Sequence, residues 1–166
     1  MSGSAPAYPD IAVLLPCYNE AATIGDVVRD FRTALPQARI FVYDNNSTDG
    51  TALTAMLAGA TVVRERRQGK GHVVRRMFCD IDADIYVMAD GDGTYAPHDA
   101  EELIRTLITE RADMVVGTRR GVHDDAGRQG HGQRGVRQTG MHANLGLAET
   151  TLLEIGHVVG LGDPVV

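Results

Sequence analysis

The sequence has no tryptophan and only two cysteines, Cys17 and Cys79, among its 166 residues. Two cysteines are too few for a disulfide framework, and they lack the Cys-x-x-Cys spacing of zinc or redox sites, so a reducing compartment is the simpler prediction. Positive charge is not in excess either, because the formal net charge is -6. This balance argues against a general binder of nucleic acid or of anionic membranes, and it favours a small-molecule or metal-assisted function.

Long apolar stretches are also missing. No run approaches the roughly 18 to 20 residues that a transmembrane helix requires. Residues 1–10 have neither the basic nor the apolar region of a signal peptide, so we expect them to form a flexible lead-in. A chain of this length with 43% hydrophobic residues suits a single domain with a substantial core, and we expect it to be cytoplasmic.

Short apolar runs alternate with segments of helical periodicity along the first 116 residues. The expected strands cover residues 11–15, 39–43, 60–63, 84–88 and 113–116. The expected helices bury apolar stripes that include Leu53, Met56 and Leu57 in the second helix and Leu103, Ile104, Leu107 and Ile108 in the fourth, and Ser47 is the expected N-cap of the second. This alternation predicts a three-layer α/β fold, with helices on both faces of a mainly parallel sheet.

Polar residues follow the predicted strands, where ligands collect in open parallel sheets. Asp90 and Asp92 stand one residue apart in the segment Ala89-Asp-Gly-Asp92, with Gly91 and Gly93 beside them. Paired carboxylates are ligands that Mg²⁺ or Mn²⁺ takes together with substrate phosphates, while the glycines allow a sharp turn and a close approach. A solvated acidic turn would have the same sequence, so the pair alone does not decide between these interpretations.

Basic residues gather between Arg64 and Arg76, where six of the sixteen occur. Lys70 lies between two glycines at an expected helix start, where backbone amides and the helix dipole favour an anion. The segment therefore predicts a phosphate site at Lys70. The alternative interpretation is a solvated basic helix face.

Five motifs in order, "VLLPCYNEAATIG", "VYDNNSTDGT", "RRQGKGHVVRRMF", "YVMADGDGTYAP" and "MVVGTRR", carry a resemblance to a known family. Together they resemble the nucleotide-binding half of an inverting family 2 glycosyltransferase of the GT-A fold, and among these the dolichyl- or polyprenyl-phosphate sugar transferases. The resemblance covers about residues 11–120, which we expect to form the nucleotide-sugar-binding domain. No Gly-x-Gly-x-x-Gly follows the first strand, so a dinucleotide-binding dehydrogenase is not indicated.

The resemblance implies a role for each matching residue. Asp44 matches the carboxylate that reads the base, whereas Asp49 better suits a turn. Asp90 matches the acid that lies against ribose or metal, and Asp92 matches the one that ligates the Mg²⁺ or Mn²⁺ ion, with Thr94 as a further contact in some relatives. The positions that hold the nucleobase and ribose are Pro16, Tyr18 and Glu20. The basic positions associated with the donor phosphates are Lys70 and Arg119, and Asp92 and Arg119 are the residues we expect to act in catalysis.

The implied reaction moves a sugar from a UDP- or GDP-sugar to an acceptor that the subgroup suggests is a polyprenyl phosphate, at the inner face of a membrane. A second hypothesis is a nucleotide-sugar-binding module without turnover. Residues 121–166 match no acceptor half, and eleven of the nineteen glycines fall from Gly117 onward. We therefore expect a divergent or poorly ordered tail, as in a chain truncated after the nucleotide-binding half, and a partner chain that supplies the acceptor half.

The segment "LLEIGHVVGLGDP" in this tail resembles the zinc helix of metzincin peptidases. Glu154, His157, Gly160 and Asp163 match that motif, but Leu153 occupies the position of the first histidine ligand. A zinc peptidase is therefore a remote alternative.

Overall fold

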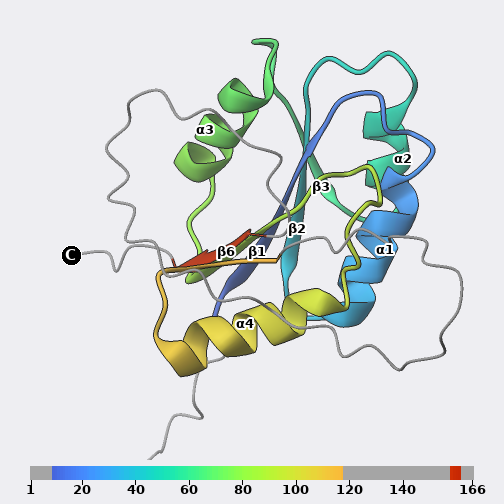
Figure 1. The fold of residues 1–166 in the computed structure, drawn as a ribbon. Helices are drawn as coiled ribbons and strands as arrows, with labels where there is room; N and C mark the ends of the chain where they lie inside the picture. The colour runs from blue at the N-terminus through green and yellow to red at the C-terminus, as the bar shows by residue number, and fades with distance from the viewer. Residues whose placement is uncertain (1–8, 118–157, 162–166) are drawn as a thin grey trace, which may run out of the picture.

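The computed structural model describes residues 9–117 and 158–161, which form one sheet with helices on both faces (Figure 1). The strands are β1 Ile11–Cys17, β2 Arg39–Asp44, β3 Thr61–Arg64, β4 Ile85–Met88, β5 Met114–Val116 and β6 Val158–Leu161. The helices are α1 Ile24–Ala34, α2 Thr51–Leu57, α3 Lys70–Asp80 and α4 Asp99–Glu110. The predicted α/β fold with a mainly parallel sheet is confirmed. None of the helices in the described part of the chain is long and apolar enough to cross a membrane.

The strand order is β3-β2-β1-β4-β6-β5. β1 pairs in parallel with β2 on one side and with β4 on the other, so the order reverses beside β1. Loops that follow β1 and β4 diverge at such a reversal, and this is where open α/β sheets form ligand-binding crevices. The predicted polar strand ends are thereby brought to one edge of the sheet.

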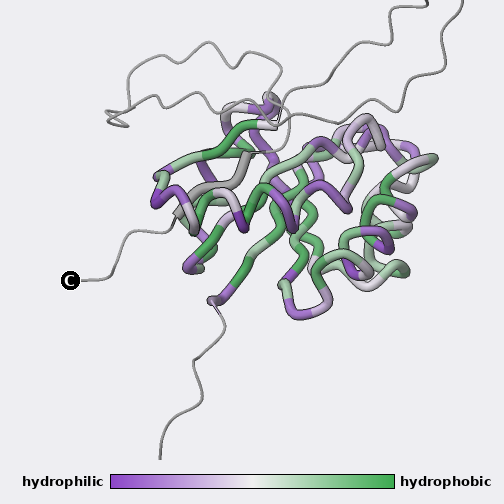
Figure 2. The backbone as a smooth tube through the Cα atoms, turned by 60° about the horizontal axis from the view of Figure 1, so that its bottom comes forward, coloured by the Kyte–Doolittle hydropathy of each residue, from purple (hydrophilic) through white to green (hydrophobic). Residues whose placement is uncertain are grey.

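The central strands β1, β2 and β4 are largely buried on both faces, as their continuous apolar runs predict. Val13 and Leu15 of β1 pack in one cluster with α1, α2 and α4, whereas Ala12 and Leu14 pack in a second cluster with α3. Figure 1 shows α3 on the opposite side of the sheet from α1 and α2, and Figure 2 shows hydrophobic segments of the backbone in the middle of the molecule. Alternate residues of each central strand therefore serve two cores.

The expected apolar stripe of α2 is wrong. Leu53, Met56 and Leu57 are 60%, 59% and 80% exposed, whereas Thr51 and Ala55 are buried. Small residues face inward because α2 packs tightly on α1: a Cβ on Gly25 would lie only 3.1 Å from Thr54 Cγ2. The N-cap is Gly50, with φ of 92°, rather than Ser47, because the Ser47 hydroxyl accepts a hydrogen bond from Asn19 N at 2.9 Å instead.

The fourth helix follows its prediction more closely. Leu103, Ile104 and Leu107 are buried as expected, but Ile108 is 54% exposed. Ile108 lies at the edge of the stripe, and the helix ends two residues later at Glu110. A side chain at this border leaves the core because no further turn follows to cover it.

Residues 158–161 differ from the tail that the sequence predicts. They form β6, which lies antiparallel between β4 and β5. The predicted zinc-helix resemblance is therefore wrong over this stretch, which is a strand, while Glu154, His157 and Asp163 lie outside the described residues. The domain boundary at residue 120 also falls outside them and stays a prediction.

Candidate functional site

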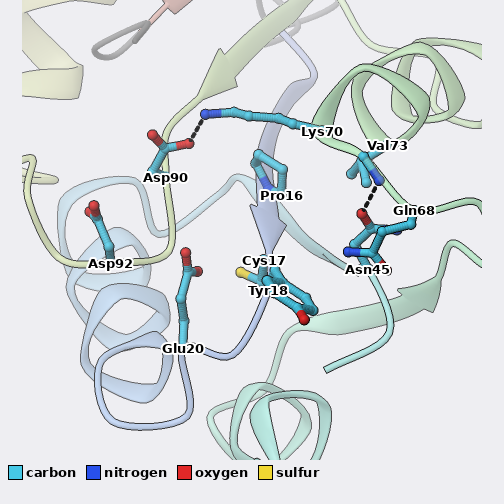
Figure 3. Close-up of a pocket in the computed structure, with 11 residues that line it drawn as sticks. Pro16, Cys17, Tyr18, Glu20, Asn45, Gln68, Lys70, Val73, Asp90 and Asp92 are labelled. Atoms are coloured by element: carbon cyan, nitrogen blue, oxygen red, sulfur yellow. Dashed lines mark hydrogen bonds and ion pairs between the residues drawn. The ribbon is translucent and has the colours of Figure 1, made fainter. Parts of the chain in front are cut away.

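A pocket of about 290 Å³ opens where β1, β2 and β4 end and α3 begins (Figure 3). Its lining residues are Pro16, Cys17, Tyr18, Glu20, Asn45, Gln68, Gly69, Lys70, Val73, Asp90 and Asp92. Six of the eight residues predicted for the site are among them: Pro16, Tyr18, Glu20, Lys70, Asp90 and Asp92. The fold thus brings together side chains that are up to 76 positions apart in the sequence.

The loop after β1 is held against the loop after β2 by backbone-to-side-chain hydrogen bonds. Glu20 N donates to Thr51 Oγ1 at 2.8 Å, and Thr51 Oγ1 in turn donates to Asp49 Oδ1 at 2.5 Å. The Thr51 bond, with a second bond from Ala21 N, lowers the pKa of Asp49. Asp49 therefore organises the turn, as predicted. The hydrogen bonds between the two loops fix the position from which Glu20 enters the pocket.

The acidic wall of the pocket consists of Glu20, Asp90 and Asp92, whose carboxylates face a common space in Figure 3. Glu20 Oε2 is buried and has no hydrogen-bond partner within the described residues. Burial raises the pKa of Glu20 to about 7, contact with the Cys17 thiol opposes this rise, and the charges of Asp92 and Asp90 add to it. A buried carboxylate oxygen without a hydrogen-bond partner costs folding free energy. This wall is therefore suited to bind a hydrogen-bond donor or a cation.

The turn that carries the two aspartates has no space for a side chain at Gly91. A Cβ there would lie 2.2 Å from Glu20 Oε2 and 2.5 Å from Cys17 Sγ. Asp92 Oδ1 accepts a hydrogen bond from Thr94 N at 2.8 Å, which closes the turn on its other side. Glycine is thus a packing requirement at position 91, and a conformational one at position 93, where φ is 75°.

Lys70 connects the two sides of the pocket. It is the first residue of α3, and its Nζ lies 2.5 Å from Asp90 Oδ1. The preceding Gly69 has φ of 123°, a conformation that L side chains rarely adopt, so glycine is required at this turn. Lys70 therefore places one positive charge among the carboxylates, as Figure 3 shows.

Asn45 is a pocket residue that the sequence reasoning missed. It is buried, and its Nδ2 donates to Glu65 O at 3.0 Å and to Arg67 O at 2.8 Å, while its Oδ1 accepts from Gly69 N at 2.7 Å. One amide thereby holds the whole loop before α3. Its position in a run of turn-forming residues predicted only a turn, because its partners lie 20 to 24 residues away.

Two predicted residues are not in the pocket lining. Asp44 is buried at the end of β2, where its Oδ1 accepts from Ser47 N at 3.2 Å and its carbonyl accepts from Glu65 N at 2.9 Å. It precedes Asn45, so it lies beside the pocket, and its role with the base stays a prediction. Arg119 lies outside the described residues.

The residues present fit a divalent ion that is held jointly with a substrate. No cluster of three or more His, Cys, Asp or Glu residues that could hold a metal occurs within residues 9–117 and 158–161. Asp90 and Asp92 supply two carboxylates, and the unpartnered oxygen of Glu20 lies near them. Mg²⁺ and Mn²⁺ prefer such oxygen donors and commonly complete their coordination with substrate phosphates and water.

Comparison with known proteins decides the family. The model of Glycosyl transferase family 2 matches residues 12–160. This chain belongs to glycosyl transferase family 2. The match runs from β1 to β6 and so includes the whole pocket, together with the strand that lies between β4 and β5.

Three relatives show how much of the family 2 protein the similarity covers. Protein RfbJ of Shigella flexneri is 54% identical over 123 residues, which is 74% of this chain and 95% of that protein. Glycosyltransferase AglJ of Haloferax volcanii is 46% identical over 67% of this chain and 37% of its own length. Dolichyl-phosphate hexose transferase of the same organism is 31% identical over 68% and 49%. The chain thus spans less than half of the two Haloferax glycosyltransferases.

Solved structures of a glucosyl-3-phosphoglycerate synthase share the fold. Glucosyl-3-phosphoglycerate synthase of Mycobacterium tuberculosis, in complex with Mn²⁺, UDP-glucose and phosphoglyceric acid, has a TM-score of 0.59 and 29% identity over 66% of this chain and 43% of that one. The same enzyme with Mg²⁺ and UDP has a TM-score of 0.60 at 30% identity, over 66% and 43%. Both complexes combine a divalent ion with a uridine nucleotide.

Proposed function

We propose that this family 2 glycosyltransferase chain binds a UDP- or GDP-sugar with Mg²⁺ or Mn²⁺ and transfers the sugar, with inversion, to a polyprenyl phosphate. The observation that carries the proposal is the meeting of Asp90, Asp92 and Lys70 with Tyr18 and Glu20 around one pocket. Two carboxylates and a lysine are the complement of a metal-bound diphosphate, and an aromatic ring at the rim suits a nucleobase.

The nucleoside is assigned to the side formed by the ends of β1 and β2. Tyr18 is 53% exposed at the pocket edge, so its ring is free to stack on a base. Pro16 lies near the end of β1 and Glu20 in the loop that follows it, and the carboxylate of Asp44 is an acceptor that suits a base N–H group. Because Glu20 and Asp44 carry acceptor oxygens, this side is expected to bind the donor N–H and O–H groups of the nucleoside.

The diphosphate is assigned to the side formed by the end of β4 and the start of α3. Asp90 and Asp92 would hold the divalent ion, which, when bound, neutralises charge on the leaving diphosphate. Lys70 lies within reach of that charge, and Arg119 is the second cation that we assign to it. Positive groups that are already in place when the bond breaks stabilise the transition state more than the ground state.

The reaction needs little help from a general base. The bond between the anomeric carbon and the donor phosphate oxygen breaks, and its electron pair leaves with the nucleoside diphosphate. An oxygen of the acceptor phosphate forms the new bond from the opposite face, which inverts the anomeric centre. A phosphate monoester has a second pKa of about 6, so the acceptor is already largely ionised at neutral pH.

The acceptor is the least constrained part of the proposal. A relative named as a dolichyl-phosphate hexose transferase, 31% identical over 112 residues, supports a lipid phosphate. Such an acceptor would be met at a membrane surface by a cytoplasmic protein that binds peripherally. We assign the acceptor half to a partner chain, and the alternative function is a nucleotide-sugar-binding module without turnover.

Calorimetric titration of UDP-glucose and of GDP-mannose, with Mn²⁺ and then with EDTA, tests donor binding. Asp92→Asn should abolish the metal-dependent heat. Asp84→Asn, at the opposite end of β4, should leave it unchanged, because Asp84 Oδ2 only accepts from Asp10 N at 2.7 Å. Unchanged affinity in Asp92→Asn would refute the metal assignment. Transfer of labelled sugar to a polyprenyl phosphate then separates an enzyme from a binding module.

A further inference from the structure

Thr23 occupies an unusual position at the start of α1. It is the N-cap residue of this helix, yet its side chain makes no capping hydrogen bond. A threonine at this position ordinarily accepts a hydrogen bond from a backbone N–H group in the first turn. Here the Thr23 hydroxyl instead donates to Gly91 O at 2.8 Å, with Glu20 O farther away at 3.3 Å.

The acceptor of this bond is the residue between the two aspartates. Gly91 already packs against Glu20 and Cys17, where no Cβ would fit. The Thr23 bond fixes the carbonyl of the same glycine from the α1 side, across 68 residues of sequence. Thr23 also lies near Gly93, where a Cβ would meet its Cβ at 3.8 Å. The turn is therefore held from two directions.

We infer that Thr23 is a positioning residue, whose hydroxyl sets the relative placement of Asp90 and Asp92 by fixing the Gly91 peptide. This inference rests on the proposed function, in which those two carboxylates hold a divalent ion. A turn with two glycines samples many conformations, and this conformational freedom is lost when both carboxylates bind one ion. A hydrogen bond that restricts the turn beforehand reduces that loss, so metal and diphosphate bind more tightly.

The local geometry separates this role from ordinary capping. Since α1 begins without a side-chain cap, removing the hydroxyl takes no capping bond from the helix. The hydroxyl bonds to a different segment instead of capping its own helix. Departures of this kind from local sequence preferences are expected at functional sites. Valine has the shape of threonine and lacks the hydroxyl, so Thr23→Val removes the bond and keeps the packing.

The experiment measures Mn²⁺ binding with UDP, by the loss of the free Mn²⁺ signal in electron paramagnetic resonance and by calorimetry. Thr23→Val should weaken Mn²⁺ binding by about 10-fold or more, the range seen when groups that orient metal ligands are removed. Thr23→Ser keeps the hydroxyl and should restore affinity to within about 3-fold of the wild type, a fraction of that range. Thr33→Val is the matched control, since Thr33 lies in the same helix and its hydroxyl donates only to Arg29 O at 3.0 Å.

Should Thr23→Val fail to fold by circular dichroism, Thr23→Ala carries the same prediction. Wild-type affinity in the folded variant, or an equal loss in Thr33→Val, would overturn the inference. Absence of Mn²⁺ and UDP binding in the wild type would instead overturn the proposed function, and the inference with it.

Discussion

The two walls of the pocket are stabilised in opposite ways. On the acidic wall, Glu20 Oε2 is buried without a hydrogen-bond partner among the described residues, beside the carboxylates of Asp90 and Asp92. On the amide wall, which Asn45, Gln68 and Gly69 form, the Asn45 side chain has partners for both its nitrogen and its oxygen. The acidic wall therefore has a carboxylate oxygen that lacks a hydrogen-bond partner in this part of the chain, whereas the Asn45 amide of the other wall is fully hydrogen-bonded without a ligand.

The difference indicates where a ligand would contribute most. Binding to a wall whose polar groups are already paired exchanges few interactions, whereas a cation on the acidic wall relieves repulsion between carboxylates. Lys70 neutralises part of the negative charge through its ion pair with Asp90. Substitutions on the acidic wall should thus act mainly on ligand binding, and those on the amide wall mainly on folding.

Among the substitutions that compare the two walls, the largest effect is expected from Gly91→Ala, which forces a methyl group into the acidic wall. Overpacking of this kind costs about 1 to 3 kcal/mol, and the aspartates must shift as Glu20 and Cys17 move away. Metal-dependent UDP binding should fall by about 100-fold, the upper range for disturbed metal sites. Calorimetry measures the binding, and thermal unfolding measures the stability.

Gly50→Ala is the matched control for this substitution. Gly50 has φ of 92° and no atom within 4 Å of an added Cβ, so alanine there brings backbone strain without overlap. Strain of about 1 to 2 kcal/mol should lower stability and leave UDP affinity intact. Equal loss of binding in both variants would mean that the acidic wall has no special sensitivity.

The second effect is expected from Asn45→Ala, on the amide wall. It leaves the carbonyls of Glu65 and Arg67 and the N–H of Gly69 without their partner. Unpaired buried groups cost about 1 to 3 kcal/mol each, reduced here by access of water from the pocket. We expect the free energy of unfolding in urea to fall by about 2 kcal/mol. Binding of the nucleotide sugar should also weaken, because Lys70 follows this loop.

Asn46→Gly provides the comparison for Asn45. Asn46 Nδ2 holds Arg66 O at 3.0 Å, but Asn46 does not line the pocket. Its φ of 68° suits glycine, so the substitution removes the side chain without strain. A smaller loss of stability with unchanged binding is expected. A greater effect than that of Asn45→Ala would show that the wall is organised from its outer side.

The third effect is a pH dependence that comes from Glu20. Its pKa is raised to about 7 by burial, from an ordinary value of 4.5. The folded state therefore binds a proton that the unfolded state has lost, so the stability is full below pH 4.5 and declines as the pH rises toward 7. Glu20→Gln removes the titrating group and should flatten this decline by about 1 kcal/mol after allowance for solvent screening.

Thermal unfolding of the wild type and of Glu20→Gln between pH 5 and 8 measures this contribution. Because the cost is paid when Glu20 ionises, the variant should be the more stable protein at pH 8 and should lose that advantage at pH 5. Mn²⁺ with UDP should shift the wild-type curve upward at high pH, since a nearby cation favours the ionised carboxyl. Parallel curves for both proteins would show that Glu20 is already ionised in the folded state.

The meeting of the polar strand ends could be predicted from sequence because each feature behind it is local. Apolar runs marked β1, β2 and β4, and polar residues such as Glu20 and Asp90 followed them directly. Parallel pairing then required those ends to meet. Asn45 and Thr23 could not be assigned in this way, because their partners lie in distant loops, and a side chain's partner is fixed only by the assembled fold.

The sheet and the helix faces show the same limit. β6 was missed because its pairing with β4 joins residues 70 to 76 positions apart, in a segment whose short apolar run resembles part of a helix. The apolar stripe of α2 was assigned to the core by periodicity, but a helix of seven residues has too few turns for periodicity to decide its face. Close packing of small residues decided it instead.

The smallest effect is expected from Leu57→Gln, on the exposed side of α2 and away from both walls. Leu57 is 80% exposed, so glutamine there removes little buried surface and should change stability by less than about 0.5 kcal/mol. Ala55→Leu, two residues earlier, places a larger side chain against the core and should cost about 1 to 3 kcal/mol. If both variants still bind UDP with Mn²⁺ as the wild type does, losses seen on the acidic wall cannot be attributed to general destabilisation. A loss of binding in Leu57→Gln would instead require α2 to act on the pocket, through the Thr51 bond that holds Glu20.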